Sequence, residues 1–104
     1  MTRKLVVFVP EDALEQVRDA LFAAGAGRIG DYERCSWYTP GTGTFLARAG
    51  AEPAVGEVGV EERVPEHRLE TVYADADHDA VVAALRRAHP YEEPAFDVVP
   101  LLDP

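Results

Sequence analysis

The chain has 104 residues, of which 47% are apolar, and its formal net charge is −9. This length supports one hydrophobic core, so a single domain over residues 1–104 is predicted. The acidic balance excludes binding through clustered Lys and Arg, so neither nucleic acid nor an anionic membrane surface is an expected partner. The lone cysteine, Cys35, excludes an internal disulfide and is typical of a reducing, cytoplasmic compartment. The apolar run at residues 5–9 is too short for a membrane span or a signal peptide.

The first part of the chain predicts a strand followed by a helix. Residues 4–10, KLVVFVP, form a short β-branched and aromatic run that indicates a buried strand. Residues 11–25 have helical periodicity. Pro10 and the acidic residues after it favour a helix start, and Gly25 favours the helix end.

The middle of the chain is predicted to contain a hairpin arm. Residues 32–39 and 43–49 are β-rich runs that flank the sequence PGTG, residues 40–43. Because glycine adopts positive φ at low cost, this sequence favours a turn between two strands. Residues 50–59 are predicted to be an ordered loop rather than a flexible linker.

The last part of the chain predicts a strand, a helix and a strand. Residues 60–74 are strand-like, and Pro65 indicates a bulge or a kink near a sheet edge. Residues 75–89 have a helical apolar stripe with an acidic start and a basic end. The proline after His89 disfavours helical geometry there and should end the helix. Residues 95–102 are predicted to be the final strand.

The two halves of the chain repeat one pattern. Both predicted helices carry apolar residues at the same spacing: Val17, Leu21 and Ala24 in the first, and Val81, Leu85 and Ala88 in the second. A strand precedes and follows each helix. The predicted fold is therefore α+β, a ferredoxin-like split β-α-β sandwich with an additional hairpin arm. Two helices on one face leave the other sheet face bare, and another copy of the chain is the cheapest cover for it.

Potential ligand donors are concentrated in the sequence HPYEEP, residues 89–94. His89, Glu92 and Glu93 offer the nitrogen and oxygen donors that suit zinc or copper. In the alternative interpretation, His89 only caps the helix C-terminus, and Tyr91 with the prolines redirects the chain into the last strand. Both interpretations remain open.

Other candidates are weaker. The sequence GTGTF, Gly41–Phe45, lacks the Lys-Ser/Thr ending of a phosphate-binding loop, and a hairpin turn is the favoured interpretation. Cys35 is either a soft metal ligand or a buried structural thiol. Trp37 and Tyr38 could offer a stacking surface, although adjacent strand residues point to opposite faces. Five carboxylates are interpreted mainly as a solvated strand face, with an acidic rim that attracts cations as the alternative: Glu57, Glu61, Glu62, Glu66 and Glu70. The chain lacks Ser-His-Asp, HExxH and CxxC motifs, which disfavours catalysis.

Four stretches together resemble a known family: LVVFVPEDALEQVRDALFAAGAGRIGDYERCSW, GTGTF, GAEPAVGEVG and HPYEEPAFDVVPL. They are similar to the YqfO-type module, which occurs free-standing and inserted in larger proteins of the NIF-three-like (NGG-one-interacting-factor-three-like) dinuclear-metal family. The string HPYEEP is also similar to the divalent-cation-tolerance protein CutA. Both resemblances imply a PII/CutA-like fold that usually assembles as a trimer with its sheets facing inwards.

The resemblance limits which residues can inherit a role. In the large NIF-three-like proteins the two metals bind in the halves that flank this module, so no hydrolase activity is implied for this chain. In CutA, metal binding is associated with the His of the His-Pro-Tyr string, a first-strand Cys and a Glu after the second proline. Only His89 matches, because Val7 and Ala95 occupy the other two positions. The nucleotide-binding motifs of PII proteins are not found here.

Together, these observations predict a non-enzymatic, trimeric, cytoplasmic binding or regulatory module. Its site is expected between subunits, with a divalent metal, zinc or copper, or a small polar molecule as the ligand. The expected metal ligands are His89, Glu92 and Cys35, and the expected ligand contacts are Tyr91, Glu93, Gly41, Gly43, Thr44 and Trp37. Two alternatives stay open: a structural or partner-binding protein without a ligand, and a metal-dependent hydrolase or its accessory subunit.

Overall fold

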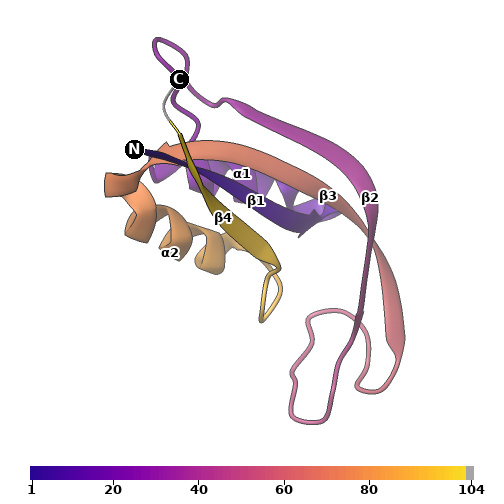
Figure 1. The fold of residues 1–104 in the computed structure, drawn as a ribbon. Coiled ribbons are helices and arrows are strands. Elements are labelled where there is room, and N and C mark those ends of the chain that lie inside the picture. Colours follow the sequence, from indigo (N-terminus) through magenta and orange to yellow (C-terminus); the bar gives the residue numbers. More distant parts are fainter. Residues whose placement is uncertain (103–104) are drawn as a thin grey trace.

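The computed structural model describes residues 1–102, which form one four-stranded sheet and two helices (Figure 1). The elements are β1 (Thr2–Pro10), α1 (Leu14–Ala23), β2 (Ser36–Leu46), β3 (Glu61–Ala74), α2 (His78–Ala88) and β4 (Phe96–Leu101). The sheet order is β2-β3-β1-β4, and every neighbouring pair is antiparallel. The predicted ferredoxin-like α+β fold is confirmed.

Both helices begin and end close to the predicted positions. A short 3-10 turn precedes each one: η1 (Glu11–Ala13) before α1 and η2 (Asp75–Asp77) before α2. Gly25, with φ of +115°, provides the left-handed residue that follows α1. His89 is extended, with φ of −74° and ψ of 131°, as expected for a residue before proline. Neither helix of the described chain is long and apolar enough to cross a membrane.

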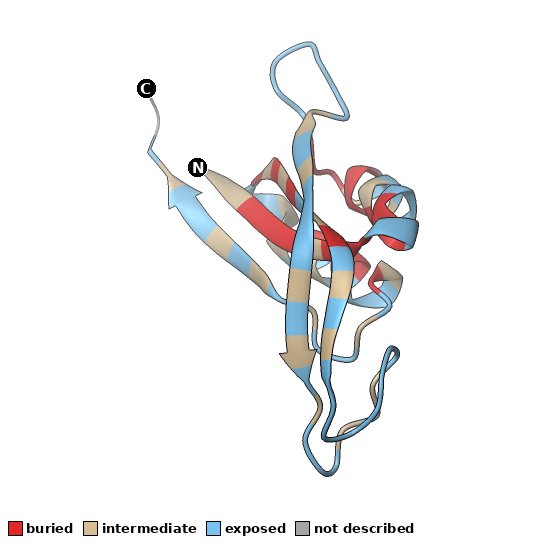
Figure 2. Cartoon of the chain, turned by 90° about the vertical axis from the view of Figure 1, so that its right-hand side faces the viewer, coloured by how far each residue is buried: buried red, intermediate tan, exposed pale blue. Residues whose placement is uncertain are grey.

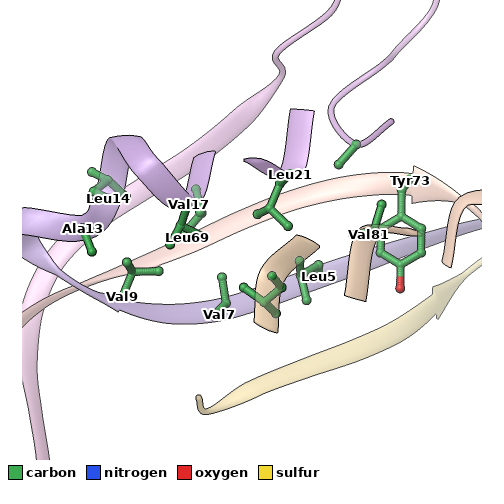
Figure 3. Close-up of a cluster of buried hydrophobic side chains, with 12 residues drawn as sticks. Leu5, Val7, Val9, Ala13, Leu14, Val17, Leu21, Leu69, Tyr73 and Val81 are labelled. Carbon is green, nitrogen blue, oxygen red and sulfur yellow. The ribbon is translucent and has the colours of Figure 1, made fainter. Parts of the chain in front are cut away.

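The hydrophobic core lies between the helices and one face of the sheet (Figure 3). Strand alternation directs the odd-numbered residues of β1 and β3 towards the helices. The apolar stripes of both helices pack against these residues. The largest fully buried side chains are Tyr73, Leu5, Leu21, Leu69, Leu85, Val7, Val9, Val17 and Val81. Burial is concentrated in β1 and the helices, whereas the last part of β2 and the first part of β3, which pair with each other, are mostly exposed (Figure 2).

Within residues 1–102 no helix covers the other sheet face (Figure 1), as predicted, but this face is not simply apolar. Glu70 lies between two basic residues, with Lys4 Nζ 3.5 Å from Oε1 and Arg68 Nε 3.3 Å from Oε2. The Arg68 guanidinium carbon lies 5.8 Å from the centre of the Phe8 ring. Trp37, which pairs with Glu70 across the strands, is 58% exposed. We call this surface the open face.

The arm differs from the predicted hairpin. β2 runs through residues 40–43 without a turn, and β3 pairs with it from Ser36↔Thr71 to Leu46↔Glu61. The predicted turn is wrong because Gly41 and Gly43 lack the positive φ that the turn would use, and because an edge strand tolerates Pro40. The reversal occurs instead in residues 47–60, which include the predicted loop.

The β2–β3 arm extends past the end of β1, whose last pair with β3 is Pro10↔Glu66 (Figure 1). Pro65 therefore pairs with Thr42 of β2 alone and needs no hydrogen bond on its other side. The register is continuous through this pair, so the predicted bulge at Pro65 is absent.

Candidate functional site

A cleft with a volume of about 420 Å³ lies where the arm meets the connection between α2 and β4. We call it the arm cleft. One end of β2, the loop after it and the α2–β4 connection form its walls, and β1 and β3 each add a residue from the open face. The lining residues are Phe8, Thr42, Gly43, Thr44, Phe45, Ala47, Ala51, Pro53, Ala54, Val55, Glu66, Tyr91, Glu92, Glu93 and Ala95.

A hydrogen-bonded pair of polar side chains lines this otherwise largely apolar cleft. The Tyr91 hydroxyl donates to Glu66 Oε2 over 2.8 Å, and Glu66 is only 8% exposed. Burial, then the bond to the carboxylate, raises the pKa of Tyr91 above its usual value. The phenol therefore stays protonated at neutral pH and remains a donor. Phe45 supports it, with its ring centre 5.7 Å from that of Tyr91 in an edge-on arrangement.

Gly43 lets the Glu66 carboxylate occupy this position. A Cβ atom on Gly43 would overlap the carboxylate oxygens of Glu66, whereas a Cβ on Gly41 would meet no atom within 4 Å. Both glycines lie in the same edge strand, and only Gly43 is required by close packing. The glycine therefore supports a buried acid rather than a turn.

His89 holds the α2–β4 connection against β1. Its Nε2 donates to the Phe8 carbonyl over 2.7 Å, and its Nδ1 accepts from the Tyr91 N–H over 3.1 Å. The side chain is 4% exposed, and burial lowers the pKa of His89, although the Phe8 carbonyl and Glu66 oppose this. The imidazole is thus neutral near pH 7, with both nitrogens engaged. Metal coordination by His89 would require breaking one of these bonds.

Glu92 connects the loop of the arm to the α2–β4 connection. Its Oε2 accepts a hydrogen bond from the Glu52 N–H over 3.2 Å. Glu92 and Glu93 are both exposed at the mouth of the arm cleft. This bond links two segments that form walls of the cleft.

The structure brings together part of the predicted site. Five predicted residues line the arm cleft: Gly43, Thr44, Tyr91, Glu92 and Glu93. His89 lies behind the cleft, with its ring centre 5.1 Å from that of Tyr91. Gly41 is in β2 before the lining segment, and Trp37 is farther along the open face.

Cys35 lies elsewhere, in the loop before β2, where its carbonyl accepts a hydrogen bond from Thr71 Oγ1 over 2.8 Å. It is partly exposed rather than buried. Within residues 1–102, the side chains of His, Cys, Asp and Glu form no group of three that could hold a metal ion. The combination of His89, Glu92 and Cys35 is therefore not assembled in this structure.

Sequence reasoning missed Glu66, Phe8 and the loop residues near Pro53. The interpretation of Glu66 as part of a solvated strand face is wrong, since the residue is buried beneath Tyr91 and beside Gly43. The only signal was the glycine at position 43. It becomes informative only once the β2–β3 register and the path of residues 89–95 are known.

Comparison with known proteins shows that longer proteins contain a segment similar to this chain. No family model matches it. The GTP cyclohydrolase 1 type 2 homolog of Mycobacterium tuberculosis is 55% identical over 101 residues, which are 97% of this chain and 27% of that protein. The protein of the same name from Bacillus subtilis is 48% identical over 99 residues, 95% of this chain and 26% of that protein. The chain thus spans about a quarter of the length of the curated relatives it matches.

Solved structures show the same relationship and also identify the fold. A Bacillus cereus protein related to NIF3 matches with a TM-score of 0.83 and 45% identity, over 98% of this chain and 26% of that one. CutA from Archaeoglobus fulgidus matches with a TM-score of 0.72 and 15% identity, over 100% and 87% of the two chains. GlnK from Bacillus subtilis matches with a TM-score of 0.58 and 16% identity, over 93% and 82%. The last two show the fold alone. The chain is therefore homologous to one segment of NIF3-family proteins, and this segment has a PII/CutA-like fold.

Proposed function

We propose that this module binds a small molecule in the arm cleft and acts as a binding or regulatory unit rather than as an enzyme. The observation that carries the proposal is the bond between Tyr91 and the buried Glu66 carboxylate, which lines a concave site with otherwise largely apolar walls. A cleft of a few hundred Å³ with a few convergent polar groups is the usual form of a ligand site. His89 contributes by positioning Tyr91 through its backbone N–H.

The donor chemistry supports binding more than catalysis. General acid–base work at neutral pH needs a group whose pKa lies near the operating pH. The pKa of Tyr91 is raised away from neutrality, and both nitrogens of His89 are already bonded. The relatives named GTP cyclohydrolase 1 type 2 homolog are about four times longer, so an activity of the whole protein is not transferred to this segment.

A metal-binding role is less well supported than an organic ligand. Zinc or copper would need His89 and Glu92 together with further donors, and Cys35 is not near them. Calorimetric titration with zinc and copper separates the two possibilities. Binding of comparable affinity to wild type and to His89→Ala would remove His89 as a metal ligand, whereas loss of tight binding in a variant that keeps the wild-type amide spectrum would support it.

We also propose that the module assembles as a homotrimer through the open face, in the cytoplasm. The open face carries exposed Trp37 and Val99 beside the charges of Lys4, Glu70 and Arg68, so it offers both apolar area and polar pairing. Sedimentation at micromolar concentration should give three times the chain mass. A stable monomer there would contradict the trimer but leave the arm cleft intact.

The binding proposal is tested by an NMR fragment screen of three proteins: wild type, Gly43→Ala and Gly41→Ala. Bound fragments should shift the amide signals of Gly43, Thr44 and Tyr91 in wild type and in Gly41→Ala. They should fail to do so in Gly43→Ala, because the added methyl group displaces Glu66. A screen at millimolar concentration with no shifts at these amides in wild type would overturn the proposal.

A further inference from the structure

We infer that the arm cleft selects a ligand with a positively charged nitrogen, an ammonium or guanidinium group on a small apolar body, and rejects phosphates and carboxylates. This inference rests on the proposed binding function and names the class of ligand.

The first support is the charge of the lining. Glu66, Glu92 and Glu93 place three carboxylates around the cleft, and its lining within residues 1–102 contains neither Lys nor Arg. His89, whose ring lies behind Tyr91, is held neutral by burial, and Arg68, which lies over the Phe8 ring, is paired with Glu70. The cleft therefore attracts cations and repels anions, in a chain whose net charge is already −9.

The second support is the state of the Glu66 carboxylate, which distinguishes the cleft from a group of exposed acids. Glu66 is 8% exposed and is fixed between Gly43 and the Tyr91 hydroxyl. Tyr91 bonds to Oε2, whereas no hydrogen bond from the described residues reaches Oε1. A carboxylate only accepts hydrogen bonds, and Oε1 is open to solvent, so it is free to accept one from a bound ligand. An N–H⁺ group of a ligand would supply the missing charged donor.

The third support is the aromatic composition of the walls. Phe8, Phe45 and Tyr91 all line the cleft, and aromatic faces attract cations that are partly removed from water. The protein already uses one of these rings in this way, since the Arg68 guanidinium carbon lies 5.8 Å from the centre of the Phe8 ring. An apolar body carrying a charged nitrogen would fit both the rings and Glu66.

An anionic ligand lacks partners in the same place. The Tyr91 hydroxyl is a donor, but Glu66 already accepts its proton. Phosphate and carboxylate groups are normally held by Arg, Lys or a helix N-terminus. The lining described above has no such basic side chain, and its three carboxylates would repel the ligand. A nucleoside triphosphate is therefore a poor fit.

The experiment compares three probes with the same ring: benzylammonium, benzyl alcohol and benzoate. Dissociation constants are measured by NMR titration of the full chain, following the amides of Gly43, Thr44 and Tyr91. Because the probes differ mainly in charge, we expect benzylammonium to bind at least about tenfold more tightly than benzoate, with benzyl alcohol between them. Equal affinities, or tighter binding of benzoate, would overturn the charge selection while leaving a ligand site in place.

Two variants test whether Glu66 causes the preference for a positively charged ligand. Glu66→Gln keeps the shape of the side chain and should weaken benzylammonium binding at least about fivefold while improving benzoate binding. Glu57→Gln makes the same charge change on an exposed residue outside the cleft and should change both affinities by less than about twofold. Equal effects of the two substitutions would contradict a specific role for Glu66. Failure of all three probes to shift the cleft amides of wild type would overturn the inference, and the fragment screen would then decide the fate of the binding proposal separately.

Discussion

Two tyrosines at opposite ends of the sheet show how similar chemistry serves different purposes in this fold. Tyr73, near the start of β1, is 2% exposed, and its hydroxyl lies 2.7 Å from His78 Nδ1. Tyr91, near the end of β1, donates to Glu66 over 2.8 Å. Desolvation is the largest cause of a raised pKa in both.

The surroundings of the two tyrosines differ. Tyr73 is packed into the hydrophobic cluster beneath the helices (Figure 3), whereas Tyr91 lines a cleft beside a buried acid. A shifted pKa therefore does not by itself distinguish a structural tyrosine from a candidate site residue. Two features distinguish Tyr91 from Tyr73. Tyr91 lines a cleft, and the second carboxylate oxygen of its partner, Glu66, receives no hydrogen bond from the described residues.

The largest expected difference comes from removing each ring. Tyr73→Ala should lower the free energy of unfolding by about 3–5 kcal/mol, because it leaves a large cavity in the core. Tyr91→Ala should cost clearly less, since its ring is partly exposed and borders a cleft that water can enter. Urea denaturation of both variants measures the difference. Equal costs would mean that Tyr91 is an ordinary core residue.

The two glycines of β2 offer a sharper test of the same contrast. Gly43→Ala should destabilise the fold by about 1–3 kcal/mol, because the methyl group overlaps the Glu66 carboxylate. Gly41→Ala has free space and should be neutral or slightly stabilising, since glycine in a strand is entropically unfavourable. Thermal or urea unfolding measures the stability of both variants. Similar stability of the two variants would argue against the packing of Glu66 over Gly43.

Removing only the hydroxyl groups should give a smaller effect. Tyr91→Phe leaves a buried carboxylate without its donor and should cost about 1–2 kcal/mol, because bonds to charged groups are the stronger ones. Tyr73→Phe breaks a bond to a histidine and should cost about 0.5–1 kcal/mol. The order of the two midpoints in urea checks this. A reversed order would indicate that Glu66 finds another donor.

The smallest effect concerns pH. The pKa of His89 is lowered below 6.5 in the folded protein, so the unfolded chain binds the proton more readily. The contribution of His89 is therefore complete above pH 6.5 and is lost as the pH falls from 6.5 towards the lower folded pKa. Unfolding free energies of wild type and His89→Gln, compared from pH 7.5 to 5, should converge at the acidic end. A constant difference would show that His89 does not titrate in this way.

Much of the fold could be predicted from the sequence because its signals are local. The spacing of Val17 and Leu21 predicts a helix face, Gly25 predicts where the first helix ends, and His89 before proline predicts the end of the second. The turn predicted at PGTG, residues 40–43, was wrong because these residues suit both a turn and an edge strand. Only the pairing with β3 decides between these outcomes.

Part of the site could also be predicted, because some of its residues are close together in the sequence. HPYEEP lies in one short stretch, so its donors could be recognised together, and Tyr91, Glu92 and Glu93 do share a cleft. Glu66 could not be found in this way, because it is 25 positions from Tyr91 and becomes buried only through the register of three strands. Contacts between distant segments carry no local sequence signal.

The most direct measurement is a crystal structure of the full chain after soaking with the small-molecule fragments identified by NMR. We predict ligand density in the arm cleft, in contact with Tyr91 or Glu66, and no such density in Gly43→Ala crystals. Density that appears only at other places, with the arm cleft filled by water alone, would contradict this prediction.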